Sequence, residues 1–195
     1  MNTDLLLNTN INNIATIYGG MRGTTLSSRH NVRHWPTVIE SGIRTIIELR
    51  KNDHSDRLCQ MCEKYGISYL EFPIDSHSVP NEVIAPKLRE FFSAIDKGYF
   101  YIACAMGQHR TDLALSIYWM FHGADKGMNP PILRGHIEDG NLVLNRLHNK
   151  VFRRLNSLYD YLVENNFVTV PDRDIFTQRK RFIIDFNRNI FNHES

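Results

Sequence analysis

The chain has few cysteines and no long hydrophobic run. Three cysteines among 195 residues are too few for the disulfide framework of a small secreted protein. No apolar run approaches the roughly 20 residues that cross a bilayer, so we expect no membrane partner. The first residues, MNTDLLLN, contain neither a basic segment nor a long apolar stretch. We therefore expect no secretory signal and predict a cytoplasmic protein.

An excess of charge of either sign is also missing. The 23 lysines and arginines nearly balance the 21 acidic residues, for a net charge of +2, so we expect no nucleic-acid partner. A hydrophobic share of 42% with 23% charged residues is typical of a globular protein, and the length suits a single domain. The composition indicates no particular oligomeric state.

One stretch carries most of the functional information. Phe100–Asp112 reads FYIACAMGQHRTD, and it is followed by the apolar segment LALSIYWMF. The first residues are aromatic and β-prone, which predicts a buried strand, whereas the last segment is apolar nearly all round, as in a buried helix. Cys104 would therefore end a strand, and Arg110 and Thr111 would begin a helix after a short loop.

This order of elements favours an anion site. The first turn of a helix has unpaired N–H groups and a partial positive charge, so the loop can hold an anion. Arg110 adds a planar guanidinium suited to two phosphate oxygens. A thiol at the base of such a loop is favoured as thiolate, which is a nucleophile. A cysteine alone would be interpreted as a core residue, but the combination predicts phosphoryl transfer to Cys104.

The stretch resembles the signature loop of the cysteine-dependent protein tyrosine and dual-specificity phosphatases, H-C-x-x-G-x-x-R-[ST]. Cys104, Gly107, Arg110 and Thr111 match it in identity and spacing. The phrases IYGG and SGIRTIIELR also resemble the amino-terminal half of bacterial members. The resemblance covers roughly residues 14–123 and is strongest at the loop.

Two positions depart from the family pattern. Ala103 stands in place of the usual histidine, which predicts a less favoured thiolate and weaker activity. Asp112 stands in place of the usual glycine and suits the first turn of a helix. Both departures leave open an alternative, a weak or inactive phosphate-binding pseudophosphatase module. Sulfur transfer by a rhodanese-like domain is a third interpretation, but it gives no role to Thr111.

The resemblance also implies a general acid. Asp75 follows the predicted strand Ile67–Pro73 and precedes Cys104 by 29 residues, a position that the acid occupies in similar enzymes. It would protonate the leaving oxygen and then activate water. The alternative is a carboxylate that only caps its loop.

The implied machinery needs no metal and no cofactor, because the loop and Arg110 already supply a positive field. Cys104 attacks phosphorus and Thr111 donates a hydrogen bond to the thiolate. The backbone of the loop holds the phosphate through Ala105, Met106, Gly107, Gln108, His109 and Arg110.

The expected substrate is a phosphorylated protein or a small phosphate ester. The loop interior has no lysine, which argues mildly against highly charged inositol phosphates. That judgement would be reversed if the rim were lined by basic residues, namely His109, Arg22, Arg29 and Arg33.

The fold prediction is α/β: a single domain with a mostly parallel central sheet, helices on both faces and a C-terminal helical extension. We expect a loose lead-in over residues 1–13, the phosphatase-like domain over 14–165 and the extension over 166–195, packed on the domain. Further strands are expected at Ile14–Tyr18 and Arg44–Arg50, and Gly19–Gly23 is interpreted as a turn. An amphipathic helix is expected over Asn81–Lys97.

The remaining cysteines, Cys59 and Cys62, form a C-x-x-C pair on a predicted helix. No second such pair or histidine pair accompanies them, so core packing is the favoured interpretation. A disulfide with oxidised Cys104 is the alternative.

Overall fold

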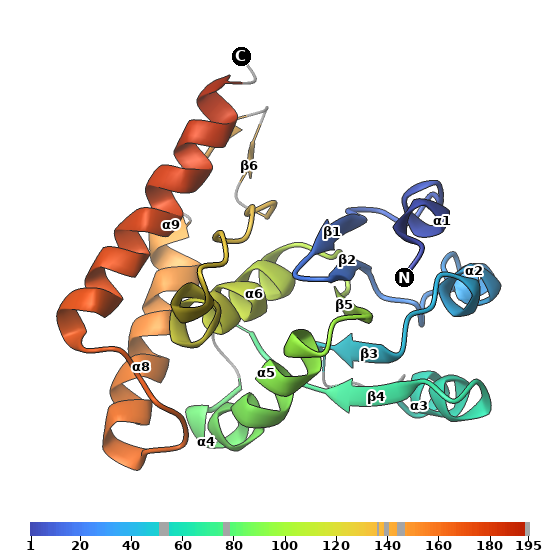
Figure 1. The fold of residues 1–195 in the computed structure, drawn as a ribbon, viewed down its shortest axis with the longest axis horizontal. Coiled ribbons are helices and arrows are strands. Elements are labelled where there is room, and N and C mark those ends of the chain that lie inside the picture. Colours follow the sequence, from blue (N-terminus) through green and yellow to red (C-terminus); the bar gives the residue numbers. More distant parts are fainter. Residues whose placement is uncertain (51–54, 76–78, 136, 139–140, 144–146, 194–195) are drawn as a thin grey trace. The chain divides into compact units, whose positions relative to one another are not determined.

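A five-stranded sheet forms the centre of the fold. The computed structural model describes residues 1–50, 55–75, 79–135, 137–138, 141–143 and 147–193 (Figure 1). The strand order is β1-β2-β5-β3-β4. The bounds of the strands are β1 Ala15–Ile17, β2 Gly20–Thr24, β3 Thr45–Glu48, β4 Ser68–Glu71 and β5 Phe100–Cys104.

The sheet is mostly parallel, as predicted. Only β1 and β2 pair antiparallel; β5 runs parallel to both β2 and β3, and β3 runs parallel to β4. All five residues of β5 are buried, because a central parallel strand is covered on both faces. The α/β class expected from the alternation of strands and helices is confirmed.

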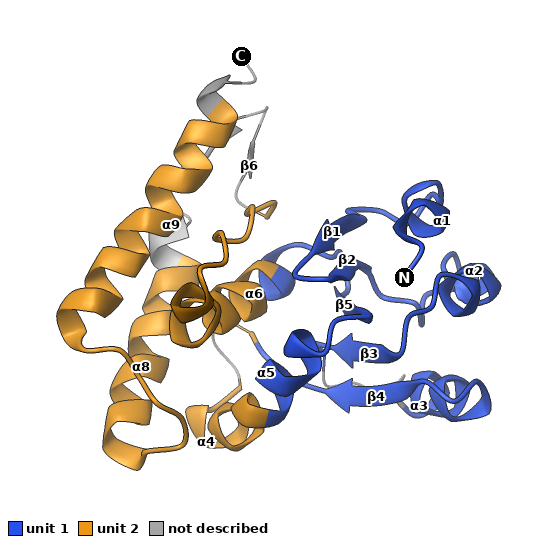
Figure 2. Ribbon diagram, viewed as in Figure 1, with its two compact units in different colours: residues 1–74, 90–111 blue, residues 75–89, 112–195 orange. Residues whose placement is uncertain are grey.

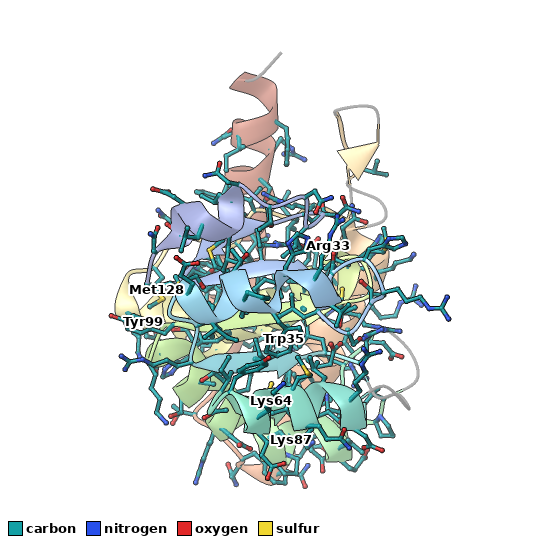
Figure 3. The ribbon with its side chains drawn as sticks, turned by 90° about the vertical axis from the view of Figure 1, so that its right-hand side faces the viewer. Arg33, Trp35, Lys64, Lys87, Tyr99 and Met128 are labelled. Atoms are coloured by element: carbon teal, nitrogen blue, oxygen red, sulfur yellow. The ribbon has the colours of Figure 1, made fainter. Side chains whose placement is uncertain are left out.

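One face of the sheet is covered by three helices: α1 Thr3–Leu7, α2 Trp35–Glu40 and α3 Ser55–Lys64. Trp35 on α2 is buried in this core (Figure 3), and its ring stacks on Tyr65 at a centroid distance of 6.1 Å. On the opposite face, α5 (Leu88–Asp96) places Phe91 against Phe72, with ring centroids 4.1 Å apart. Strand β5, which ends in Cys104, is therefore covered by helices on both faces of the sheet.

The glycine run interpreted as a turn is a strand instead. Gly20–Thr24 forms β2, and the turn lies before it at Tyr18 and Gly19, both with positive φ. A Cβ on Gly20 would come within 2.5 Å of the Phe100 ring. Gly19 therefore serves the turn, whereas Gly20 and Gly23 are explained by the side chains of Phe100 and Tyr101 on the neighbouring strand β5.

The chain forms two compact units, residues 1–74 with 90–111 and residues 75–89 with 112–195 (Figure 2). The first contains the sheet. The second contains α4 Asn81–Ile84, most of α6 His109–Phe121, a hairpin of β6 Ile137–Glu138 and β7 Asn141–Leu142, α8 Arg153–Asn165 and α9 Arg173–His193. Three-residue 3₁₀ turns lie at Val32–His34 and Ala85–Lys87, a longer one at Gly123–Lys126, and a π-helical stretch at Leu147–Phe152.

Aromatic stacking joins the last two helices of the second unit. Phe176 on α9 lies against Tyr159 on α8, with ring centroids 4.2 Å apart, and against Phe121 on α6 at 5.9 Å. The predicted C-terminal helix is thus present and packed, while the proposed domain boundaries stay predictions. Among the described residues, no helix is both long and apolar enough to span a bilayer.

Two local predictions were wrong. The helix expected over Asn81–Lys97 is divided at Ala85–Lys87, because Pro86 lacks the N–H that a continuous helix needs. The lead-in expected to be loose contains helix α1, whose Leu6 is fully buried. A single buried leucine in a polar, Asn-rich context gave no periodic signal.

Candidate active site

Cys104 ends the central strand and lies between the two neighbouring strands. Its side chain is buried, and its carbonyl accepts a hydrogen bond of 2.9 Å from the N–H of Thr25, just after β2. The carbonyl of Ala103 accepts one of 2.9 Å from the N–H of Leu49, just after β3. The backbone at Cys104 is therefore fixed from both sides at the carboxyl edge of the sheet, where parallel sheets place ligands.

The helix after the loop brings a hydroxyl to the sulfur. Helix α6 begins at His109 and contains Arg110 and Thr111 in its first turn. Thr111 is buried and its Oγ1 lies 3.3 Å from Cys104 Sγ, in the geometry of a hydrogen bond that the hydroxyl donates. Such a bond stabilises a thiolate more than a thiol.

Two side chains, one just before β1 and one from β2, hold the outer carbonyls of the loop. Asn13 Nδ2 donates to the carbonyl of Met106 at 2.8 Å, and Arg22 Nη2 donates to that of Gly107 at 2.8 Å. In a planar trans peptide the C=O and the following N–H point in opposite directions. The N–H groups of Gly107 and Gln108 are therefore turned away from these side chains, as an anion cradle requires.

The loop glycine is required by both conformation and packing. Gly107 has φ of +65°, and a Cβ there would lie 2.5 Å from the carbonyl carbon of Gly23. Gly23 in turn faces the hydroxyl of Tyr101, which donates to the carbonyl of Thr24 at 2.7 Å. No other residue type would let the loop lie this close to strand β2.

The remaining loop residues differ in exposure. Ala105, Met106 and His109 are exposed, whereas Gln108 and Arg110 are half-buried. Met106 is 54% exposed, which places its side chain at the rim of the loop.

A polar cluster lies beside Cys104 at the ends of β2 and β3. Glu48 is buried and pairs with Arg50 Nε at 2.7 Å. Thr25 Oγ1 donates to Glu48 Oε2 at 2.7 Å, and Arg50 Nη2 donates to Thr25 Oγ1 at 2.9 Å and to Ser27 Oγ at 2.7 Å. Because the Thr25 N–H also donates to the Cys104 carbonyl, this cluster fixes the base of the loop.

The two departures from the family pattern have structural explanations. Ala103 belongs to the core cluster on the face covered by α1, α2 and α3, where a histidine would have to be buried. The carboxylate of Asp112 is buried and its Oδ2 accepts from the N–H groups of Arg134 and Gly135 at 2.9 and 2.8 Å. Asp112 therefore anchors a loop within the second unit.

Asp75 begins the second compact unit, directly after Ile74, whose N–H donates to the Leu49 carbonyl at 3.2 Å. Its side chain is half-buried, and its Oδ1 accepts a hydrogen bond of 3.1 Å from the N–H of Val79. Asp75 therefore makes the loop-capping hydrogen bond that the alternative interpretation predicts. A cap and a general acid are compatible, because a carboxyl group has a second oxygen.

The three arginines considered for a basic rim do not share one role. Arg22 is buried and holds the loop backbone, so the condition that it lines the rim is not met. Arg29 and Arg33 are exposed on the segment that precedes α2, where Figure 3 labels Arg33. No group of three or more His, Cys, Asp or Glu side chains within the described part of the chain is arranged to hold a metal ion.

The C-x-x-C pair has one exposed and one buried member. Cys59 is exposed and Cys62 is buried on α3, and both are free thiols. Burial, and to a lesser extent Cys59, raises the pKa of the Cys62 thiol to about 12. Cys62 therefore stays protonated at neutral pH, which agrees with core packing.

Solved structures with a similar fold include a complex with phosphotyrosine and two proteins described as phosphatases. TpbA of P. aeruginosa in complex with phosphotyrosine has 13% identity and a TM-score of 0.43, covering 92% of this chain and 90% of its own. The catalytic core of SIW14 from S. cerevisiae, a PP-IP phosphatase, has 13% identity and a TM-score of 0.44, covering 94% and 93%. The Yvh1 phosphatase domain of Chaetomium thermophilum has 17% identity and a TM-score of 0.41, covering 90% and 96%.

No family model matches the chain, and a search of curated proteins found no match.

The sequence did not reveal the residues that hold the loop. Asn13, Arg22, Thr25 and Glu48 reach it through contacts between segments far apart in the chain. One signal was present: Arg22 stands in a short segment of glycine and apolar residues, and a buried arginine requires hydrogen-bond acceptors.

Proposed function

We propose that the protein is a metal-independent phosphate monoester hydrolase that acts through a cysteinyl-phosphate intermediate, similar to protein tyrosine and dual-specificity phosphatases. One observation carries the proposal: Thr111 Oγ1 lies at hydrogen-bond distance from Cys104 Sγ, in a loop whose outer carbonyls are held by Asn13 and Arg22. Together these contacts support a thiolate facing inward N–H groups, which is the arrangement that phosphoryl transfer to sulfur requires.

In the first step, the thiolate of Cys104 attacks phosphorus while the bond from phosphorus to the ester oxygen breaks. Asp75 gives its proton to the departing oxygen, which leaves as an alcohol or phenol. Arg110 and the N–H groups of residues 105–110 hold the three phosphoryl oxygens, whose negative charge grows in the transition state.

In the second step, the Asp75 carboxylate takes a proton from water and the water oxygen attacks phosphorus. The sulfur–phosphorus bond breaks, inorganic phosphate is released, and the thiolate leaves toward the hydroxyl of Thr111. Asp75 is then protonated again, so the cycle closes without a metal or cofactor.

A phosphorylated protein or a small phosphate ester is the proposed substrate. The exposed Met106 side chain offers an apolar contact to an aromatic leaving group, which favours phosphotyrosine or aryl phosphates. We also infer a cytoplasmic setting, because all three cysteines are free thiols and a reactive thiol persists in a reducing compartment.

The alternative is a phosphate-binding module without turnover, and it rested on two departures from the signature pattern, Ala103 and Asp112. One of the two no longer supports it. Asp112 was a possible source of repulsion toward a phosphate dianion, but its buried carboxylate is engaged by two backbone N–H groups. Only the absence of a histidine at Ala103 still favours this alternative.

Hydrolysis of p-nitrophenyl phosphate without added metal tests the proposal. We expect turnover that is abolished by Cys104→Ser and reduced by Asp75→Ala, less on this good leaving group than the roughly 10²–10³-fold expected with phenyl phosphate. Circular dichroism should show that both variants remain folded. Absence of turnover in the intact protein, together with measurable binding of inorganic phosphate, would establish the binding module instead.

A further inference from the structure

Helix α8 contains a buried arginine within the second unit. Arg154 is 8% exposed, and its Nη2 donates a hydrogen bond to the carbonyl of Val79. Burial lowers the pKa of Arg154, while the carboxylates of Asp75 and Glu82 oppose that effect. A buried guanidinium is costly unless it is paired, so its position beside these carboxylates needs an explanation beyond packing.

Val79 connects this arginine to the carboxyl group of Asp75. Its N–H donates to Asp75 Oδ1 at 3.1 Å, while its C=O accepts from Arg154. Both backbone polar groups of one residue are therefore used, one by the carboxylate and one by the guanidinium. A change at Arg154 would be transmitted to Asp75 through a single residue.

A second contact joins the same segment to the same face of α8. Asn81 Nδ2 donates to the carbonyl of Ser157 at 3.1 Å and to its Oγ at 3.0 Å. Arg154 and Ser157 are three positions apart, so both lie on one face of the helix. Val79 and Asn81 are thus both held to α8.

We propose that Arg154 is a positioning residue for the general acid: it holds Val79, and through Val79 it sets the orientation of the Asp75 carboxyl group. This inference rests on the proposed phosphatase function. In this proposal, a residue of helix α8 orients the carboxyl group that donates the proton. The rival interpretation is an arginine that only stabilises the packing of α8.

The two interpretations differ in their dependence on the leaving group. A poor leaving group such as phenolate needs a proton in the transition state, whereas p-nitrophenolate departs readily without one. Misplacing the acid therefore slows hydrolysis of phenyl phosphate far more than that of p-nitrophenyl phosphate. A loss of general packing lowers both rates by the same factor.

The experiment measures kcat and KM on both substrates for the intact protein and for Arg154→Met. We expect kcat on phenyl phosphate to fall about 10–100-fold and kcat on p-nitrophenyl phosphate to change less than about threefold. In the background of Asp75→Asn, Arg154→Met should cause no additional loss, since both changes remove the same step. Arg154→Gln replaces Arg154→Met if the latter does not fold.

Arg89→Met is the matched control. Arg89 Nε also donates to a backbone carbonyl, that of Phe167 at 3.0 Å, but its side chain is exposed. We expect this variant to hydrolyse both substrates at the rates of the intact protein.

Equal losses on the two substrates, or a full additional loss in the Asp75→Asn background, would overturn the role of Arg154. Turnover that survives Cys104→Ser would instead overturn the proposed function, so the two failures are distinguishable.

Discussion

Gly107 in the loop lies against Gly23 in strand β2, so closely that a Cβ on Gly107 would come within 2.5 Å of the Gly23 carbonyl carbon. Two glycines about 80 residues apart therefore make one contact that permits the loop to close over β2. Gly107 is needed for two reasons, its positive φ and its close approach to Gly23. Mutagenesis can measure the two effects separately.

Gly107→Ala should abolish activity and lower stability by more than the cost of positive φ alone, which is about 1 kcal/mol. Gly66→Ala is the matched control, because Gly66 has the same φ of +65° and a Cβ added there would meet nothing within 4 Å. Urea unfolding and phosphatase assays measure both variants. Equal destabilisation, with activity retained in Gly107→Ala, would show that the contact with Gly23 is not limiting.

Arg22→Met should weaken phosphate binding, because the Gly107 carbonyl loses a charged donor. A hydrogen bond to a charged group contributes about 1.5–3 kcal/mol, so the Kd for inorganic phosphate should rise at least about tenfold. Calorimetry measures this Kd. Arg33→Met, at an exposed arginine, should leave it unchanged, and a similar rise there would indicate a general charge effect.

Asp112→Leu should destabilise the fold by about 3 kcal/mol, because the N–H groups of Arg134 and Gly135 lose their acceptor in a buried place. Asp112→Asn keeps an acceptor oxygen and should cost about 1 kcal/mol or less. Denaturant midpoints compare the two variants. If both variants are as stable as the intact protein, the anchoring role of Asp112 is wrong.

Alkaline pH should reduce stability through Cys62. Because burial raises the pKa of this thiol to about 12, the folded state keeps the proton at pH values where the unfolded chain has lost it. The stabilisation is complete below the ordinary thiol pKa of about 8.5 and is lost as pH rises, by at most about 1.4 kcal/mol per pH unit.

The free energy of unfolding between about pH 8.5 and 10.5 should therefore fall more steeply for the intact protein than for Cys62→Ala. Cys59→Ala, at the exposed member of the pair, should keep the slope of the intact protein. Parallel curves for all three proteins would contradict the assignment.

The sequence predicted the elements that local patterns determine. The apolar run ending in Cys104 and the helix after it were placed correctly because their hydrophobic character is strong and uninterrupted. The strand at Arg44–Arg50 was found for the same reason. The spacing of the signature loop also placed Thr111 next to the sulfur, since a strand, a short loop and a helix leave little conformational choice.

What the sequence did not predict depends on contacts between distant segments. Glycines usually mark turns, but those of β2 make room for Phe100 and Tyr101. The partners of Asp112 lie more than 20 residues later, and no local rule relates them. Asn13 and Arg22 reach the loop only after β1, β2 and β5 have paired.

The order of the strands determines when the proposed site can form during folding. Strand β5 lies between β2 and β3, and Met21 pairs with Tyr101, roughly 80 residues later in the chain. Contacts of such long range form slowly, because a large loop must close before they stabilise anything. The surroundings of Cys104, the nucleophile that we propose, would thus be completed only when its strand has inserted between β2 and β3. The proposed site and the native sheet would then form in the same step of folding.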